Sequence, residues 1–208
     1  MKHAATRALF AYWDTLRGER CAPERSEIDP TAIRGILADT FVIEVDDQRT
    51  CPFRIAGTRV SALVGKELKG ESFTALWQGS ARDEGGALID MIVNESAPAV
   101  ASVIAWTRDG AACDLELLLL PLRHRGRTHA RMLGSLSPLT VPPRLGLDPV
   151  EKLELRSQRV IYAGERLDSP GLPTPREALP FARPERRGHL FVFSGGKDAD
   201  SSDALKRR

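Results

Sequence analysis

The sequence predicts an α+β domain in which a five-stranded antiparallel sheet has its helices on one side and is preceded by N-terminal helices. Two observations predict this class. The spacing of apolar residues changes along the chain, so that helical spacing is followed by two strands, a group of helices and three further strands. The dipeptide Asp109-Gly110 joins two apolar runs, which is a strong hairpin signal and indicates antiparallel pairing.

The first element is expected to be a helix within residues 7–17. Leu9, Trp13 and Leu16 recur there at the i, i+4, i+7 spacing that places them on one helical face. Gly18 ends the pattern, as glycine commonly does at a helix C-terminus.

A second, short helix is expected to begin at Pro30. Asp29 is a suitable N-cap, and proline is favoured at the first helical position because its missing N–H would be unpaired there anyway. Ile28 and Ile33 fall at the N′ and N4 positions of a hydrophobic staple. The buried side of this helix would hold Ile33, Ile36 and Leu37.

Two strands follow, because the apolar period changes to two. The stretch TFVIEVD (residues 40–46) alternates, and residues 51–56 return as its antiparallel partner. Phe53 and Ile55 are expected to point inward and Arg54 outward.

A group of small helices is expected where the chain leaves this hairpin at Gly57. Val60 and Leu63 recur at helical spacing, Gly65 ends the turn, and the segment 73–77 packs close behind. A longer helix over residues 81–95 then precedes the strands 99–110, 111–122 and 129–139.

The expected organisation has three parts. Residues 1–38 form an N-terminal helical segment, residues 39–141 form the sheet domain, and residues 142–208 form an extension that is largely irregular or disordered. Within this extension, residues 152–161 fit either one more strand or a short helix, and residues 188–193 fit an isolated strand or a partner-binding segment.

Composition excludes several classes of protein. Thirty basic and twenty-eight acidic residues leave a formal net charge of +2, so bulk charge does not predict nucleic-acid binding. No apolar run approaches the length of a membrane helix, and the N-terminus does not resemble a signal peptide, so we expect no membrane insertion and a cytoplasmic location. The scattered cysteines Cys21, Cys51 and Cys113 are expected to be reduced thiols without a metal site.

Three stretches carry a resemblance to a known family. YWDTLRGER, IDP.AIRGIL.DTFVIEV and FRIAGTRVSALVGKELKG.SF..LW together resemble small, stand-alone PAS proteins of alphaproteobacteria. These stretches span residues 12–77, and the resemblance continues more weakly to about residue 139. It implies a sensory or interaction module in which the sheet and its small helices enclose a cavity.

This resemblance gives a set of expected cavity-lining residues. They are Phe53, Arg54, Arg59, Val60, Leu63, Phe73, Trp77 and Trp106. Two alternatives stay open for them: the arginines either contact a ligand anion or are solvated charges, and the aromatic residues either line a cavity or form plain core.

PAS modules often dimerise through an N-terminal helix, so Leu9, Trp13 and Leu16 are the expected dimer or partner face. The alternative is that this face covers the domain's own sheet. A signalling protein partner and a homodimer are both expected partners. The arginine-rich turn at residues 123–131 suits phosphate contacts, yet an exposed hairpin turn is readily charged, so nucleic acid is not expected.

Haem and a photoactive flavin are not expected as cofactors. The longer helix over residues 81–95 has no histidine to bind haem iron, and residues 65–77 have no cysteine to form a flavin adduct. The sequence also lacks GxSxG, HExxH, Walker and kinase motifs, so an enzyme is not expected. The SGGKDAD stretch (residues 194–200) resembles a pyrophosphatase phosphate loop without the domain that such a loop needs.

Three hypotheses about function follow. The first and favoured one is a regulatory PAS protein that signals through a protein partner, with or without a small ligand. The second is a ligand sensor whose main role is to bind a metabolite or nucleotide. The third is an enzyme of an unrecognised type.

Overall fold

The computed structural model describes most of the chain up to residue 162 and two short strands beyond it. The described residues are 1–46, 48, 50–78, 81–125, 127–141, 147–162, 185–187 and 190–192. The chain divides into two compact units, Met1–Leu167 and Asp168–Arg208. The second unit contains β7 (Glu185–Arg187) and β8 (Leu190–Val192), which pair antiparallel.

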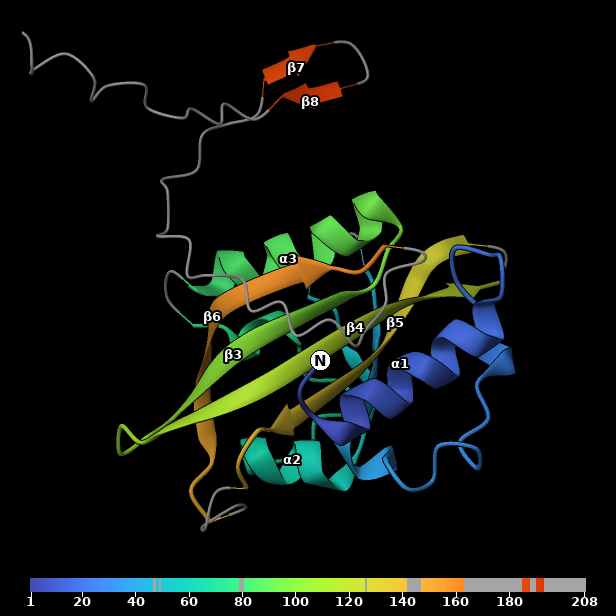
Figure 1. The fold of residues 1–208 in the computed structure, drawn as a ribbon. Coiled ribbons are helices and arrows are strands. Elements are labelled where there is room, and N and C mark those ends of the chain that lie inside the picture. Colours follow the sequence, from blue (N-terminus) through green and yellow to red (C-terminus); the bar gives the residue numbers. More distant parts are fainter. Residues whose placement is uncertain are drawn as a thin grey trace, which may run out of the picture. The chain divides into compact units, whose positions relative to one another are not determined.

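The first unit is built on a six-stranded antiparallel sheet (Figure 1), and the predicted α+β class is confirmed. The strands lie in the order β2-β1-β5-β4-β3-β6. Their bounds are β1 Thr40–Glu44, β2 Phe53–Ala56, β3 Ala99–Thr107, β4 Ala112–His124, β5 Arg127–Pro138 and β6 Val150–Val160. The expected hairpin at Asp109-Gly110 joins β3 to β4.

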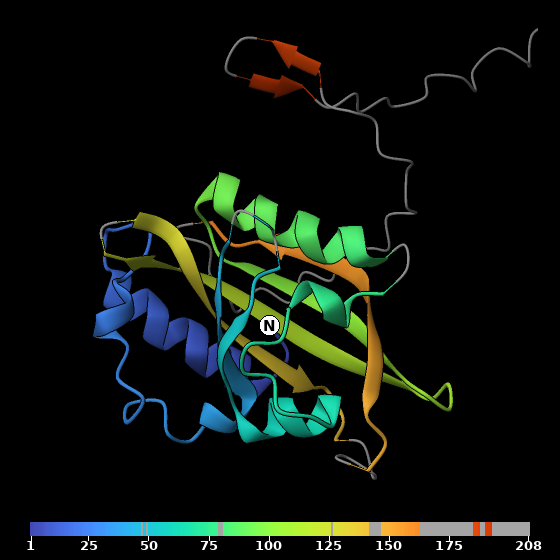
Figure 2. The ribbon, with the colours of Figure 1, turned by 180° about the vertical axis from the view of Figure 1, so that it is seen from behind.

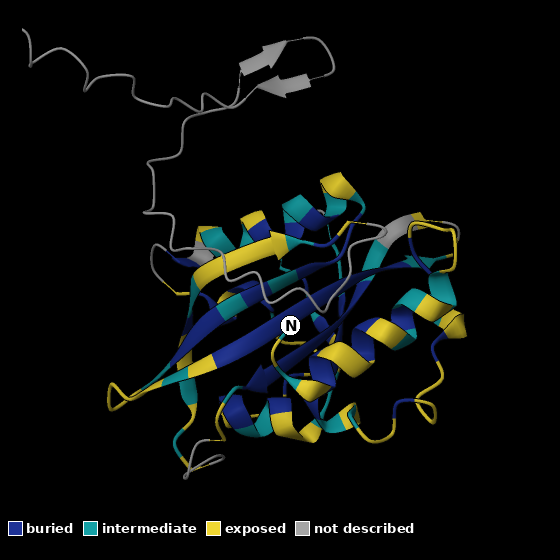
Figure 3. Ribbon diagram, viewed as in Figure 1, coloured by how far each residue is buried: buried dark blue, intermediate teal, exposed yellow. Residues whose placement is uncertain are grey.

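The sixth strand lies in the extension, where residues 152–161 were expected to form either one more strand or a short helix, and the structure has the strand. β6 pairs with β3 from Ala99–Val160 to Thr107–Val150, so the compact unit continues beyond residue 141. Figure 3 shows why this strand has a weak pattern: much of it is exposed. An edge strand buries few side chains, so its sequence alternates little.

Helices cover both faces of the sheet. α2 (Thr58–Val64), the 3₁₀ turn η3 (Thr74–Leu76) and α3 (Ala81–Glu95) lie over the face seen in Figure 2. α1 (Ala4–Arg17) lies across the opposite face, seen in Figure 1. Each face therefore has its own apolar cluster, which we call the inner cluster under α2 and α3 and the outer cluster under α1.

The expected second helix is instead a series of turns followed by the 3₁₀ turn η2 (Leu37–Asp39). Its hydrogen bonds are of the i to i+3 type, for example from Ile36 N–H to the Ile33 carbonyl at 2.9 Å. Nucleating an α-helix is unfavourable, and so short a segment makes too few further hydrogen bonds to offset it. Its start is nevertheless as predicted, because Asp29 Oδ1 accepts the Thr31 N–H at 2.8 Å and Ile33 is buried.

A β-bulge reverses the predicted direction of Ile55. Val42 pairs with Ile55 and Ile43 pairs with Phe53, so Arg54 is an extra residue on β2. Phe53 therefore points inward and is 1% exposed, whereas Ile55 shares the outer face with Val42 and is 52% exposed. A single inserted residue shifts the alternation, which the sequence pattern could not indicate.

Candidate functional site

Five of the expected lining residues gather in the inner cluster. The rings of Phe53 and Phe73 lie 5.9 Å apart between centroids, and those of Phe73 and Trp77 lie 6.2 Å apart. Val60 and Leu63 join them from α2, and all five are at most 3% exposed. These side chains form one packed wall between the sheet and the small helices.

Phe41 completes this aromatic group, although it was not among the expected lining residues. Its ring lies 5.4 Å from that of Phe53 and 6.0 Å from that of Phe73. A β-carbon at Gly134 of the adjacent strand β5 would lie 2.3 Å from the Phe41 ring. Because position 134 is glycine, there is room for the Phe41 ring. A single sequence does not reveal this relation between the two residues.

Trp77 has an unusual polar feature within this wall. Its indole Nε1 is buried and has no hydrogen-bond partner among the described residues. The ring lies against Gly85 of α3, where a β-carbon would come within 2.5 Å of Cδ1. An unpaired buried donor is unfavourable, so the Nε1 group is a candidate contact for a ligand acceptor or a water molecule.

The remaining three expected lining residues lie elsewhere. Trp106 alternates with the inward-facing Ala105 on β3 and therefore points to the opposite face, where its Nε1 donates to Glu154 at 3.0 Å. Arg59 pairs with the buried Asp39 at 2.5 Å. Arg54 pairs with Glu44, with Nε 2.6 Å from Oε2.

The face of α1 that was expected to meet a partner lies against the chain's own sheet. Leu9 is fully buried and Trp13 is 1% exposed in the outer cluster. The Trp13 Nε1 donates to the Pro121 carbonyl of β4 at 2.9 Å. Leu16 is only partly buried beside them. In this structure the apolar face of α1 takes the alternative role of covering the sheet.

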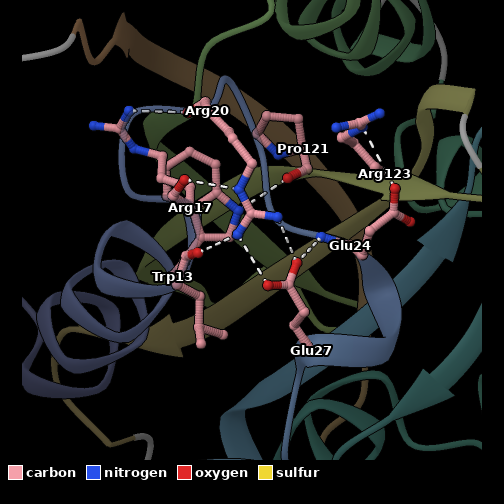
Figure 4. A network of polar contacts seen from close by, with 8 residues as sticks. Trp13, Arg17, Arg20, Glu24, Glu27, Pro121 and Arg123 are labelled. Carbon is pink, nitrogen blue, oxygen red and sulfur yellow. Dashed lines mark hydrogen bonds and ion pairs between the residues drawn. The ribbon is translucent and has the colours of Figure 1, made fainter.

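A polar network fixes the end of α1 and the segment that follows it (Figure 4). Arg20 and Glu27 form a two-pronged pair with both N–O distances at 2.9 Å. Glu24 lies beside Arg123 of β4, at 3.5 Å. Arg17 stacks over the Trp13 ring, 5.3 Å from its centroid. Residues of the stretch WDTLRGER thus take part in a network that holds α1 against the sheet.

Two pKa values in this network are shifted by the same pair. The hydrogen bond from Arg20 and the backbone N–H of Glu24 hold the pKa of Glu27 below its usual value. The hydrogen bond to Glu27 raises the pKa of Arg20. Both groups are exposed, so the pair orders the segment more than it stabilises the fold.

Arg54 borders a cleft at the β1–β2–β5 side of the sheet. The cleft has a volume of about 480 Å³, and Arg125 of the β4–β5 turn lines it together with Arg127 and Arg131 of β5. The structure thus brings together the two basic elements that the sequence had presented separately, Arg54 and the arginine-rich turn.

Metal-binding groups and thiols are the other candidate chemistry in the same part of the chain. Among the described residues, no group of three or more His, Cys, Asp and Glu side chains is placed to hold a metal ion. Cys21, Cys51 and Cys113, all among the described residues, form no disulfide, and burial raises the pKa of the Cys113 thiol. No described helix is long and apolar enough to cross a membrane.

A sheet of antiparallel strands with small helices over one face and an N-terminal helix over the other defines a PAS-type domain. The chain belongs to this family, because a family model described as PAS domain matches residues 1–137. The resemblance drawn from the three sequence stretches is confirmed at the level of the family. The match includes α1 as well as the sheet up to β5.

Several solved structures are similar to the chain. A light-oxygen-voltage domain studied with a flavin analogue is 12% identical, with a TM-score of 0.43 over 56% of this chain and 86% of that one. The PAS domain of the fruit-fly ELK potassium channel is 17% identical, with a TM-score of 0.42 over 53% and 94%. An RNA-binding light-oxygen-voltage receptor is 18% identical, with a TM-score of 0.41 over 57% and 36%. No curated protein matches the chain.

Proposed function

We propose that this protein is a non-catalytic sensory or regulatory PAS protein that acts in signal transduction by binding a protein partner. The observation that carries the proposal is the family match over residues 1–137, since PAS domains commonly mediate protein interactions. The partner contact is proposed at β2, an edge strand of the sheet on which Ile55 is 52% exposed. Leu37 is also exposed nearby, its carbonyl lying against Gly57 at the end of β2.

Site-specific photo-crosslinking in the native host tests this proposal. A photoreactive residue at position 55 is compared with one at position 141, since Val141 is also apolar and is 65% exposed. We expect one discrete crosslinked protein from position 55 and none from position 141, and we expect Ile55→Asp to weaken the binding of that protein. Equal adducts from both positions, or binding that tolerates Ile55→Asp, would contradict a partner site at β2.

A ligand sensor is the second candidate function, and the unpaired Nε1 of Trp77 is the observation that favours it. The proposed ligand is a small molecule with a hydrogen-bond acceptor, held between the sheet and α2, η3 and α3. Native mass spectrometry of the purified protein, together with its absorbance spectrum, tests for a co-purified molecule. We expect Trp77→Phe to lose that molecule, because the donor is removed and the ring volume is largely kept.

The ligand-sensor function would be refuted by the opposite result of these two measurements. If no mass excess is found and Trp77→Phe is as stable as the parent or more stable, the Nε1 group pairs with neither a ligand nor a fixed water molecule. The loss of an unpaired buried donor would then be neutral or favourable, since replacing such a group removes a desolvation penalty of about 1–3 kcal/mol.

A further inference from the structure

The cleft beside Arg54 is strongly cationic. Its charged and titratable lining, among the residues that the structure describes, consists of four arginines, one carboxylate and one histidine: Glu44, Arg54, His124, Arg125, Arg127 and Arg131. They come from the end of β1, the β2 edge, and the turn and strand that follow β4. Residues 54 and 125 are far apart in the sequence, and the β1–β5 pairing brings their strands to the same side of the sheet.

The single carboxylate does not neutralise these charges. Both Arg54 and Arg131 are directed to the same atom, Glu44 Oε2, at 2.5 Å and 3.7 Å. Arg131 Nε is buried and has no hydrogen-bond partner within the described residues. In the same part of the chain, neither Arg125 nor Arg127 has an acidic partner. Guanidinium groups that line one cleft repel one another, and an anion between them offsets that repulsion.

The turn that carries Arg125 is poorly suited to arginine on backbone grounds. Arg125 has a φ of +52°, in the left-handed region that glycine and asparagine adopt more easily. His124 pairs with Arg127, so the connection between β4 and β5 is a two-residue turn, of the kind that favours asparagine or glycine. The local backbone does not explain an arginine at this position, whereas a need for positive charge does.

We infer that this cleft binds a small anion with two linked phosphate groups, either an organic diphosphate or pyrophosphate itself. Guanidinium forks match the oxygen pairs of phosphate groups, and a cleft of about 480 Å³ lies in the size range of small-ligand sites. Two phosphate groups in ester and anhydride linkage carry about three negative charges at neutral pH. Four guanidinium groups and one carboxylate leave about three positive charges, so the charges of ligand and site balance.

The same observations favour a small anion over a nucleic acid. The positive charge is confined to one concave site that includes Glu44, and a carboxylate at this position would repel a continuous phosphate backbone. Since the net charge of the whole chain is only +2, no wider basic surface is implied.

Calorimetric titration of the full chain with ADP and with inorganic pyrophosphate tests the inference at an ionic strength of about 50 mM, where screening is weak. The first variant is Arg125→Asn, because asparagine suits the positive φ and the fold is therefore expected to be kept. The matched control is Arg108→Gln, which removes an arginine whose side chain is 85% exposed and pairs with Glu151. We expect the first variant to bind about tenfold more weakly, the usual effect of losing one charge-assisted contact, and the control to be unchanged.

Glu44→Gln is expected to change the affinity for the probes in the opposite direction. This change frees Arg54 and Arg131 from their shared carboxylate, so we expect the probes to bind more tightly by a factor of several. A variant that merely loosened the fold would weaken binding instead.

The inference is overturned if neither probe binds at about 1 mM, if Glu44→Gln weakens binding, or if Arg108→Gln is as damaging as Arg125→Asn. Tighter binding of a short single-stranded oligonucleotide than of ADP would overturn it in favour of nucleic acid. This test is independent of the proposed partner at β2, because its variants are scored by ligand affinity alone.

Discussion

Two consecutive glycines in α3 allow the packing of Trp77 to be tested by paired substitutions. A β-carbon at Gly85 would lie 2.5, 2.6 and 2.8 Å from three atoms of the Trp77 indole. A β-carbon at Gly86 would meet nothing within 4 Å. The two positions share the same helix interior, so Gly85→Ala and Gly86→Ala differ mainly in this contact.

The expected magnitudes follow from two opposing effects. Replacing glycine by alanine inside a helix stabilises it by about 0.5–1 kcal/mol, and Gly86→Ala should show this gain alone. At Gly85 the new methyl group must displace the indole, and overpacking of this kind costs about 1–3 kcal/mol. The indole is 1% exposed and is held by Phe73, so it has little room to move away. We expect Gly85→Ala to destabilise the protein by about 1–2 kcal/mol.

Urea unfolding followed by far-ultraviolet circular dichroism measures this difference, because it does not depend on the fluorescence of Trp77. Gly86→Ala should raise the midpoint and Gly85→Ala should lower it, with the same m-value for both. The reasoning about α3 is refuted if Gly85→Ala is as stable as Gly86→Ala. It also fails if Trp77→Ala, which removes all three contacted indole atoms, does not relieve the effect of Gly85→Ala, because the clash is assigned to the indole.

Two further predictions concern the segments around α1. Glu116 is 6% exposed and accepts the backbone N–H groups of Lys2 and His3 at 2.6 and 2.8 Å, so Glu116→Gln places an amide donor against one of them. We expect a loss of about 1–3 kcal/mol in the free energy of unfolding and faster hydrogen exchange at the start of α1. The pKa of Glu27 is lowered, so its contribution to stability is present above the unfolded pKa and is lost as the pH falls through the folded pKa. NMR titration should find this carboxyl below its usual pKa, and Arg20→Gln should raise it, whereas an unchanged value would refute the assigned cause.

The sequence was most informative where local chemistry decides the structure. The turn at Asp109-Gly110 and the glycines around α2 each specify a local backbone conformation, and the corresponding elements were predicted. Asp29 marks the predicted start of its segment, although that segment forms turns in place of the expected helix. The inward direction of Phe53 also followed from simple alternation. In these cases the information lies within a few residues of the feature that it determines.

The parts that were not predicted depend on contacts between distant segments. For residues 152–161 the sequence left a strand and a short helix as alternatives, because β6 has too few buried side chains to show a period, and its place in the sheet is set by β3. The position of Arg54 depends on a bulge, and its meeting with Arg125 depends on the pairing of β1 with β5. Gly134 looks unremarkable in the sequence and becomes informative only beside the Phe41 ring. Non-local geometry therefore determined which basic residues share a site.

The cationic cleft and the inner cluster are connected through shared backbone. Arg54 follows Phe53 on β2, and Arg131 precedes Met132 on β5, so each of these two arginines has a fully or almost fully buried neighbour in the inner cluster. A closely packed interior yields little, so these buried neighbours hold the backbone of both strands in place. The ion pairs of Arg54 and Arg131 with Glu44 therefore stand on strands that the inner cluster fixes. Charge at the edge of the sheet and the packing beneath α2 and α3 are thus connected through the backbone of β2 and β5.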